Sequence, residues 1–205
     1  MTVKKEAAYL AHLSKDKKLE KVLQNSAGKK LEKRRNVTLH LMRSIMSQQL
    51  STKVAKVIYD RFIDLFDGVE PTPVQVADMP FEQLRSIGLS NAKTHYIQNI
   101  ARYALEYDMS DKALHKMSDD EVKEFLLPIK GVGKWTVEML LMFALGREDV
   151  FAVDDLGIQQ AMIQVYKLDP ADKKQLREKM LQLSARWRPY RTYACLHLWE
   201  HKDGN

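Results

Sequence analysis

The residues best suited to chemistry lie in two short stretches of the sequence. The first has Gly131 and Gly133 on either side of Val132, directly before an apolar segment that predicts a helix. Glycine tolerates positive φ and a close approach to the backbone, and the free N–H groups at a helix N-terminus favour an anion. The second has the acidic pair Asp154 and Asp155 before another predicted helix. These stretches predict a phosphate grip followed by a carboxylate.

Helices are expected to position both stretches. Good helix formers make up much of the chain, while Gly and Pro are sparse and fall between periodic segments, so the predicted fold class is all-α. A capping box from Ser118 to Glu121 predicts the helix that leads into the glycine turn. Other helices are predicted within 4–24, as a pair within 39–66 joined by a polar corner, and over 91–107, 155–166, 170–183 and 189–201.

The composition limits the class of protein. A length of 205 residues suffices for one or two small domains, and the net charge of +6 favours a polyanionic partner without requiring one. The basic segment 29–35 fits either a phosphate-contacting stripe or a solvated helix face or linker. The single Cys195 excludes an internal disulfide and a cysteine-ligated metal. Without an apolar run of about 18 residues, a soluble intracellular protein is expected.

Five stretches together resemble the helix–hairpin–helix base-excision DNA glycosylases, and the last resembles the DNA-3-methyladenine glycosylase II branch. They cover residues 45–51, 84–93, 127–136, 149–158 and 187–199. The resemblance implies two helical subdomains with an active-site cleft between them, one from 38–150 and the other from 1–37 plus 151–205. It also implies a compact form without the small N-terminal β domain of some members, and without the four cysteines of the iron–sulfur members.

The resemblance also implies a catalytic residue. The family aspartate stands three residues before the position of Ile158, which selects Asp155 and leaves Asp154 as a helix cap or a partner of Asp155. A carboxylate there would stabilise an oxocarbenium-like sugar and orient or deprotonate the attacking water. Bifunctional members carry a lysine nucleophile at the position of Trp135, so a monofunctional enzyme that uses water is expected.

A base pocket is implied by further family positions, namely Trp135 and Trp199, with Met139 one helical turn beyond Trp135. A purine methylated at N3 or N7 is already cationic, so it leaves as a neutral base without a general acid. An aromatic face attracts such a base by about 0.5–2 kcal/mol. Without the resemblance, core packing is the commoner role of these three side chains.

DNA contacts are implied at two places. A side chain from the corner after Ser47 fills the space left by the flipped base, and the alignment selects Gln49. Hairpin residues grip a backbone phosphate, and the carbonyls of two of them offer a place for a monovalent cation; no other cofactor or metal is expected. The predicted phosphate contacts are Gly131, Val132, Gly133, Lys134 and Thr136, and the cation carbonyls are those of Ile129 and Gly131.

The sequence therefore predicts a monofunctional DNA N-glycosylase that flips out and hydrolytically excises alkylated purines from double-stranded DNA in base excision repair. We expect a monomer without a membrane contact, located in the cytoplasm or nucleus. The alternatives are a non-catalytic helix–hairpin–helix DNA-binding module and a bifunctional lyase, which the tryptophan at position 135 disfavours. The range of lesions stays open, because it depends on the shape of the pocket.

Overall fold

The computed structural model describes residues 2–204, and side chains from residue 6 to residue 204. No strand occurs within this range, so the all-α prediction is confirmed. The chain divides into two compact units, one formed by Lys33–Leu145 and the other by Met1–Glu32 with Gly146–Asn205. The sequence-based division at 38 and 150 differs by about five residues at each boundary and stays a prediction.

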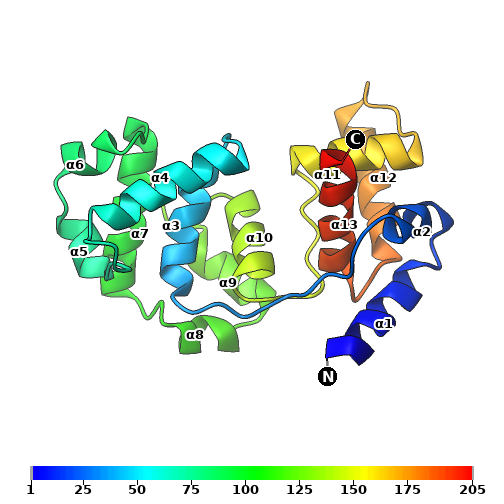
Figure 1. The fold of residues 1–205 in the computed structure, drawn as a ribbon, viewed down its shortest axis with the longest axis horizontal. Helices are drawn as coiled ribbons and strands as arrows, with labels where there is room; N and C mark the ends of the chain where they lie inside the picture. The colour runs from blue at the N-terminus through cyan, green and yellow to red at the C-terminus, as the bar shows by residue number, and fades with distance from the viewer. Residues whose placement is uncertain (1, 205) are drawn as a thin grey trace. The chain divides into compact units, whose positions relative to one another are not determined.

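The unit Lys33–Leu145 is built around its first helix, α3 (Val37–Ser47), which packs against α4, α7 and α10 (Figure 1). Its side chains Leu41, Met42 and Ile45 are almost completely buried, because an apolar stripe at helical spacing faces these neighbours. The other helices of the unit are α4 (Thr52–Asp64), α5 (Pro73–Asp78), α6 (Phe81–Ser86), α7 (Asn91–Glu106), α8 (Asp111–Lys116), α9 (Asp119–Leu126) and α10 (Lys134–Phe143).

Helix caps define the ends of these elements. Ser118 and Glu121 form the predicted capping box of α9. Ser51 caps α4 through its hydroxyl group, as the polar corner suggested. Helix α8 was not predicted; its first residue, Asp111, accepts hydrogen bonds from the backbone N–H groups of Asn36 and Val37 at 2.9 and 2.8 Å. This long-range contact helps to fix the start of α3.

The second unit contains α1 (Thr2–Leu13), α2 (Lys17–Gln24), α11 (Leu156–Tyr166), α12 (Lys173–Ala185) and α13 (Arg191–Asp203). Helix α13 packs against α11 and α2 (Figure 1). Trp187 is 1% exposed, and its indole N–H donates to Asp16 at 3.2 Å, while the Tyr166 hydroxyl donates to the same carboxylate at 2.8 Å. Residues distant in sequence thereby form one core.

Two predicted helix boundaries move inward. Helix α12 begins at Lys173 rather than at 170, because the Asp172 side chain caps it by accepting from the next backbone N–H groups. Helix α13 begins at Arg191 rather than at 189. None of the helices within residues 2–204 is both long and apolar enough to cross a membrane.

Candidate active site

The hairpin between α9 and α10 contains two glycines, and the structure requires glycine at only one of them. Gly131 has φ = +104°, and a Cβ atom there would lie 2.1 Å from Cγ of Tyr96, so both the backbone and packing against α7 require glycine. Gly133 has φ = −98°, and a Cβ atom there would meet open space. The fold itself therefore does not require glycine at 133, and the surface there is open to an outside group.

Gly133 is also the N-cap of α10, and no described side chain caps this helix. The first N–H groups of an α-helix have no partner within the helix, and its N-terminus carries partial positive charge. Lys134 follows with an exposed ammonium group, 3.8 Å from a carboxylate oxygen of Glu138. The start of α10 thus offers a positively polarised surface.

Two predicted contact residues are not available through their side chains. Val132 is 6% exposed and Thr136 only 1%, and the Thr136 hydroxyl accepts a hydrogen bond from the Gln48 amide at 3.0 Å. A DNA contact at these two positions is therefore restricted to backbone atoms. The sequence missed this because hairpin spacing does not reveal which side chains turn inward.

The predicted cation carbonyls lie in the same turn. The carbonyl of Ile129 accepts a hydrogen bond from the Val132 N–H at 2.9 Å, and the Lys130 carbonyl accepts from the Asn99 amide at 3.1 Å. Among the described residues, no group of three or more His, Cys, Asp or Glu side chains is arranged to hold a metal ion. The monovalent cation stays a prediction.

The corner between α3 and α4 separates the roles of two adjacent glutamines. The Gln48 side chain points inward to Thr136, whereas Gln49 is exposed and has a positive φ of 59°. Positive φ is uncommon for residues other than glycine, so the surrounding contacts must hold this conformation. The predicted wedge residue is therefore presented outward at a defined point of the surface.

A pocket of about 790 Å³ lies in the unit Lys33–Leu145, between α3, α4 and α10. The structure places the predicted base-pocket residues Trp135 and Met139 together in its lining. Trp199, the third predicted pocket residue, belongs to the other unit and is not part of this lining. Sequence reasoning missed the polar part of the lining, which includes Arg34, His40, Arg43, Lys56, Tyr59 and Glu70.

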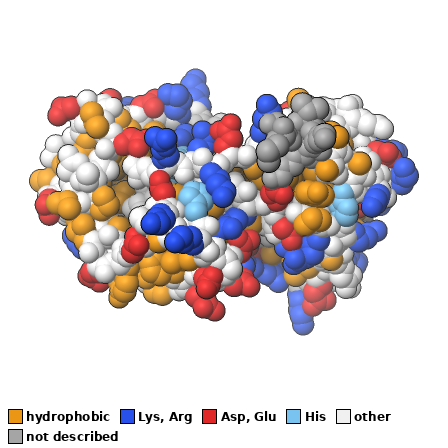
Figure 2. All heavy atoms as spheres, turned by 90° about the horizontal axis from the view of Figure 1, so that it is seen from below, with side chains coloured by type: hydrophobic (Ala, Val, Ile, Leu, Met, Phe, Trp, Pro, Cys, Tyr) orange, Lys and Arg blue, Asp and Glu red, His pale blue; other side chains and the backbone are white. Residues whose placement is uncertain are grey.

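This polar part is predominantly cationic. The Arg43 guanidinium lies over the Tyr59 ring at 4.6 Å from its centre, a cation–π contact that orients it. Burial, followed by the nearby charges of Arg43 and Arg34, lowers the pKa of His40, which favours its neutral form. Figure 2 shows Lys and Arg side chains gathered beside a histidine on one face of this unit.

The basic segment 29–35 resolves differently along its length. Its residues lie outside any helix, which leaves the linker and the phosphate-contacting stripe and excludes a helix face. Lys29 pairs with Glu200 at 2.5 Å, whereas Arg34 lines the pocket and donates its backbone N–H to the Ala144 carbonyl at 2.8 Å. Lys29 and Arg34 are therefore each held in place by a contact with a residue distant in sequence.

Asp155 is the N-cap of α11, in the other unit. Its Oδ1 atom accepts a hydrogen bond from the Ile158 N–H at 2.9 Å and another from the Trp199 indole N–H at 2.8 Å. A Cβ atom at Gly157 would lie 3.1 Å from Oδ1 of Asp155 and 3.1 Å from Nε1 of Trp199, so glycine makes room for the hydrogen bond between these two atoms. Two donors and a helix N-terminus therefore stabilise the carboxylate in one orientation.

Asp154 is not the helix cap, which was one of its two expected roles. The sequence assigned it as a helix cap or a partner of the catalytic carboxylate, but Asp155 is the cap. The Asp154 side chain is exposed and pairs with Arg177 at 3.1 Å. The cap assignment was wrong because two adjacent acidic residues both precede the helix, and only the backbone conformation decides which one turns back to it.

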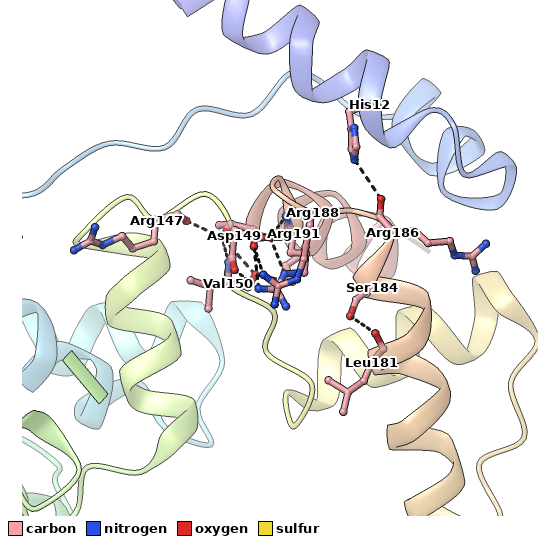
Figure 3. Close-up of polar contacts among 11 residues, drawn as sticks. His12, Arg147, Asp149, Val150, Leu181, Ser184, Arg186, Arg188 and Arg191 are labelled. Atoms are coloured by element: carbon pink, nitrogen blue, oxygen red, sulfur yellow. Dashed lines mark hydrogen bonds and ion pairs between the residues drawn. The ribbon is translucent and has the colours of Figure 1, made fainter. Parts of the chain in front are cut away.

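The start of α13, the helix that carries Trp199, is held by a cluster of hydrogen bonds drawn in Figure 3. Arg191 binds Asp149 through Nε and Nη2 at 2.7 and 3.0 Å, and Arg188 binds the same carboxylate at 2.9 Å. The buried Thr192 hydroxyl donates to the Arg147 carbonyl at 2.7 Å. These contacts tie the segment that leads to Asp155 to the helix that supplies its hydrogen-bond donor.

Comparison with known proteins agrees with this geometry. Residues 42–186 match the family described as HhH-GPD superfamily base excision DNA repair protein, which covers the hairpin, the corner and Asp155. The chain belongs to this superfamily. The predicted family is thereby confirmed.

Individual superfamily members are similar over most of the chain. DNA-3-methyladenine glycosylase 1 of Schizosaccharomyces pombe is 34% identical over 186 residues, which is 90% of this chain and 80% of the relative. The structure of 3-methyladenine DNA glycosylase Mag1 from that yeast, in complex with abasic DNA, has a TM-score of 0.84 at 33% identity, covering 94% of this chain and 95% of that one. A DNA-3-methyladenine glycosidase from Bacillus halodurans has a TM-score of 0.78 at 33% identity, covering 96% and 88%.

Proposed function

We propose that this protein is a monofunctional DNA glycosylase that removes alkylated purines from double-stranded DNA by hydrolysis. The observation that carries the proposal is Asp155, a carboxylate held by the Trp199 indole and by the N-terminus of α11 at the position of the family aspartate. Relatives at about one-third identity are named DNA-3-methyladenine glycosylases, and one of the similar structures contains abasic DNA.

The role proposed for Asp155 is electrostatic and basic. As the bond to the base breaks, the sugar gains positive charge, and a preorganised carboxylate stabilises that charge. The same group orients or deprotonates the attacking water. Both hydrogen bonds to Oδ1 fix the orientation of the carboxylate, so it does not have to reorganise during the reaction.

We propose that the enzyme is monofunctional because it has no lysine nucleophile at the family position. Trp135 follows the second hairpin glycine by two residues, where a lyase of this superfamily would need an amine. An indole ring forms no Schiff base with the sugar. Water is therefore the proposed nucleophile, and no strand cleavage is expected.

We assign two groups of residues in the lining of the 790 Å³ pocket to different parts of the substrate. Trp135 and Met139 offer an aromatic and a polarisable surface, which suits a cationic methylated purine. Arg34 and Arg43 would repel that cation but attract a phosphate, so we assign them to the DNA backbone. Trp199 is also proposed to contact the base, in addition to its hydrogen bond to Asp155.

DNA binding is proposed at the hairpin and the corner. The backbone near Gly131 and Gly133 would bind a phosphate of the damaged strand, with Lys134 adding charge. Gln49 would enter the duplex when the damaged base leaves it. These contacts recognise the shape of DNA rather than its sequence, as a repair enzyme requires. We propose that the protein acts as a monomer.

A base-release assay on methylated DNA tests the proposal with Asp155→Asn. Asparagine caps a helix about as well as aspartate, so the fold should be retained while the charge is lost. We expect the rate to fall by about 10²–10⁴-fold, the range for a general base or a key electrostatic group. Asp154→Asn is the matched control and should be active. Near-normal release by Asp155→Asn would refute the assignment.

Two other outcomes would identify the alternatives. Binding to damaged DNA without any base release by the wild-type protein would indicate a non-catalytic helix–hairpin–helix module. A covalent complex trapped with borohydride would indicate a lyase. Oligonucleotides that each carry one lesion would then define which alkylated purines are released.

A further inference from the structure

Lys93, at the start of α7, is placed where a lysine is electrostatically unfavourable. It is the third residue of its helix, and its own N-terminus carries partial positive charge. Burial lowers the pKa of its ammonium group, which means that the charged form loses solvation there. A compensating interaction must therefore explain the position of this side chain.

That interaction lies at the end of α3. The Lys93 ammonium donates hydrogen bonds to the carbonyl oxygens of Met46 at 3.0 Å and of Gln48 at 2.6 Å. The last carbonyls of a helix have no partner within the helix, and a cation stabilises the negative end of its dipole. Lys93 is therefore a long-range cap that fixes the backbone on both sides of Ser47.

The same corner is fastened to α10. The side chain of Gln48 donates from Nε2 to the hydroxyl oxygen of Thr136 at 3.0 Å, and Thr136 is the third residue of α10, which starts at Lys134. Thr136 is 1% exposed, so the acceptor of this part-buried hydrogen bond is shielded from water. Gln48 thus links the corner to the beginning of the hairpin helix.

Gln49 follows directly and has the left-handed backbone conformation, with φ = 59°. A residue other than glycine is disfavoured in this region, because its Cβ atom lies too close to the following carbonyl oxygen, so the corner would relax if its neighbours were not fixed. Lys93 holds the carbonyl before Gln49, and Thr136 holds the side chain before it. The exposed glutamine is the one residue of this group that points outward.

We propose that Lys93 and Gln48 are positioning residues that hold Gln49 at a fixed place relative to the hairpin, so that it enters the DNA as the damaged base leaves. This inference rests on the proposed role of Gln49 in DNA. Neither positioning residue is assigned a contact with the reacting atoms. Loss of the Lys93 ammonium should impair the insertion of Gln49 more than the binding of DNA.

Insertion is measured with a duplex that contains a tetrahydrofuran abasic analogue and 2-aminopurine in the opposite strand next to it. Protein binding is followed by anisotropy, and unstacking by 2-aminopurine fluorescence at saturating protein. The variants are Lys93→Met, which keeps an unbranched side chain without donors, Lys93→Arg, which keeps charge and donors, and Gln49→Ala. Lys123→Met, on α9 in an exposed pair with Asp120, is the matched control.

The expected fluorescence increase is present in the wild type, Lys93→Arg and Lys123→Met, and lost in Gln49→Ala and Lys93→Met. The base-release rate of Lys93→Met on methylated duplex should fall at least about tenfold, because two hydrogen bonds from a charged group are lost. In the Gln49→Ala background, Lys93→Met should have no further effect, because both changes remove the same insertion step. A general loss of stability would instead add to the first defect.

Three results would overturn the inference: an unchanged fluorescence increase in Lys93→Met, additive effects of the two substitutions, or no increase in the wild type. The last result, together with normal base release, would leave the glycosylase assignment intact and remove only the role of Gln49. Absence of base release by the wild type would refute the proposed function, while the fluorescence of Lys93→Met would still report on the corner.

Discussion

Replacing each hairpin glycine by alanine should separate folding from DNA binding. In Gly131→Ala the new Cβ atom meets Cγ of Tyr96 at 2.1 Å, and the backbone keeps φ = +104°. Backbone strain of about 1–3 kcal/mol and overpacking of about 1–3 kcal/mol then add to about 2–6 kcal/mol. For a chain of this length, the melting temperature Tm should fall by roughly 4–24 °C.

Gly133→Ala should behave in the opposite way. Its φ of −98° suits alanine and the new Cβ atom would meet open space, but alanine is a poorer N-cap than glycine, so stability should change by less than about 1 kcal/mol. If a phosphate approaches this backbone, the methyl group blocks it. Loss of one hydrogen bond to a charged group is worth about 1.5–3 kcal/mol, so affinity for DNA should fall by about 10–100-fold.

The two measurements are thermal unfolding followed by circular dichroism and DNA binding followed by anisotropy at fixed salt. Gly68→Ala is the control for backbone strain, because its φ is +77° and a Cβ atom there has no neighbour within 4 Å. A stable Gly133→Ala protein that binds DNA as the wild type does would refute the proposed phosphate grip. An unchanged Tm in Gly131→Ala would refute the packing argument.

Three further changes test individual contacts. Trp199→Phe keeps an aromatic ring but removes the indole N–H that donates to Asp155 at 2.8 Å. Single-turnover base release should therefore slow about tenfold with DNA affinity unchanged. An unchanged rate would argue against a role of this hydrogen bond in base release. Burial first, then the charge of a nearby lysine, lowers the pKa of His197 from 6.5 to about 4. As the pH falls, the unfolded chain therefore binds a proton at His197 before the folded chain does, and the free energy of unfolding should drop by about 3 kcal/mol between pH 6.5 and 4. In urea titrations His197→Asn should flatten this pH dependence. An equally steep curve in the variant would contradict the prediction. Asp149→Asn breaks a largely buried ion-pair cluster and should cost about 1.5–3 kcal/mol by urea unfolding, whereas Asp154→Asn, in an exposed pair, should cost less than about 1 kcal/mol; equal effects would show that burial does not matter here.

Local sequence signals predicted the helical framework well. The Ser118 to Glu121 capping box and the serine that opens α4 act through hydrogen bonds three residues apart, so the sequence contains all the information that they need. Helix α8 was missed, although Ser110 caps it, because its six residues are too few for a periodic pattern. Its first residue, Asp111, contacts the start of α3 across 75 residues of sequence.

The candidate site also has features that the sequence predicted and features that only the structure revealed. The resemblance selected Asp155 and Gln49, but it did not reveal the Trp199 N–H on the carboxylate or the Lys93 cap behind the corner. It also left Thr136 among the DNA contacts, although this side chain is buried. Each of these features depends on a contact between residues that are more than 40 positions apart in the sequence, and local sequence patterns do not predict such contacts.

The sequence by itself determined the fold class, through its helix-forming composition and periodicity, and the family, through its resemblance to known members. It also predicted the phosphate grip and the carboxylate, because glycines in a turn and an acidic residue before a helix act through their own backbone. Only the tertiary structure decided which of two acidic residues is the cap, which of two adjacent glutamines is exposed, and which glycine is required by packing. Asp154 and Asp155 both suit a helix cap, and Gly131 and Gly133 both suit a turn. The packed neighbours Trp199 and Tyr96 distinguish them, because they occupy the space beside only one of each pair.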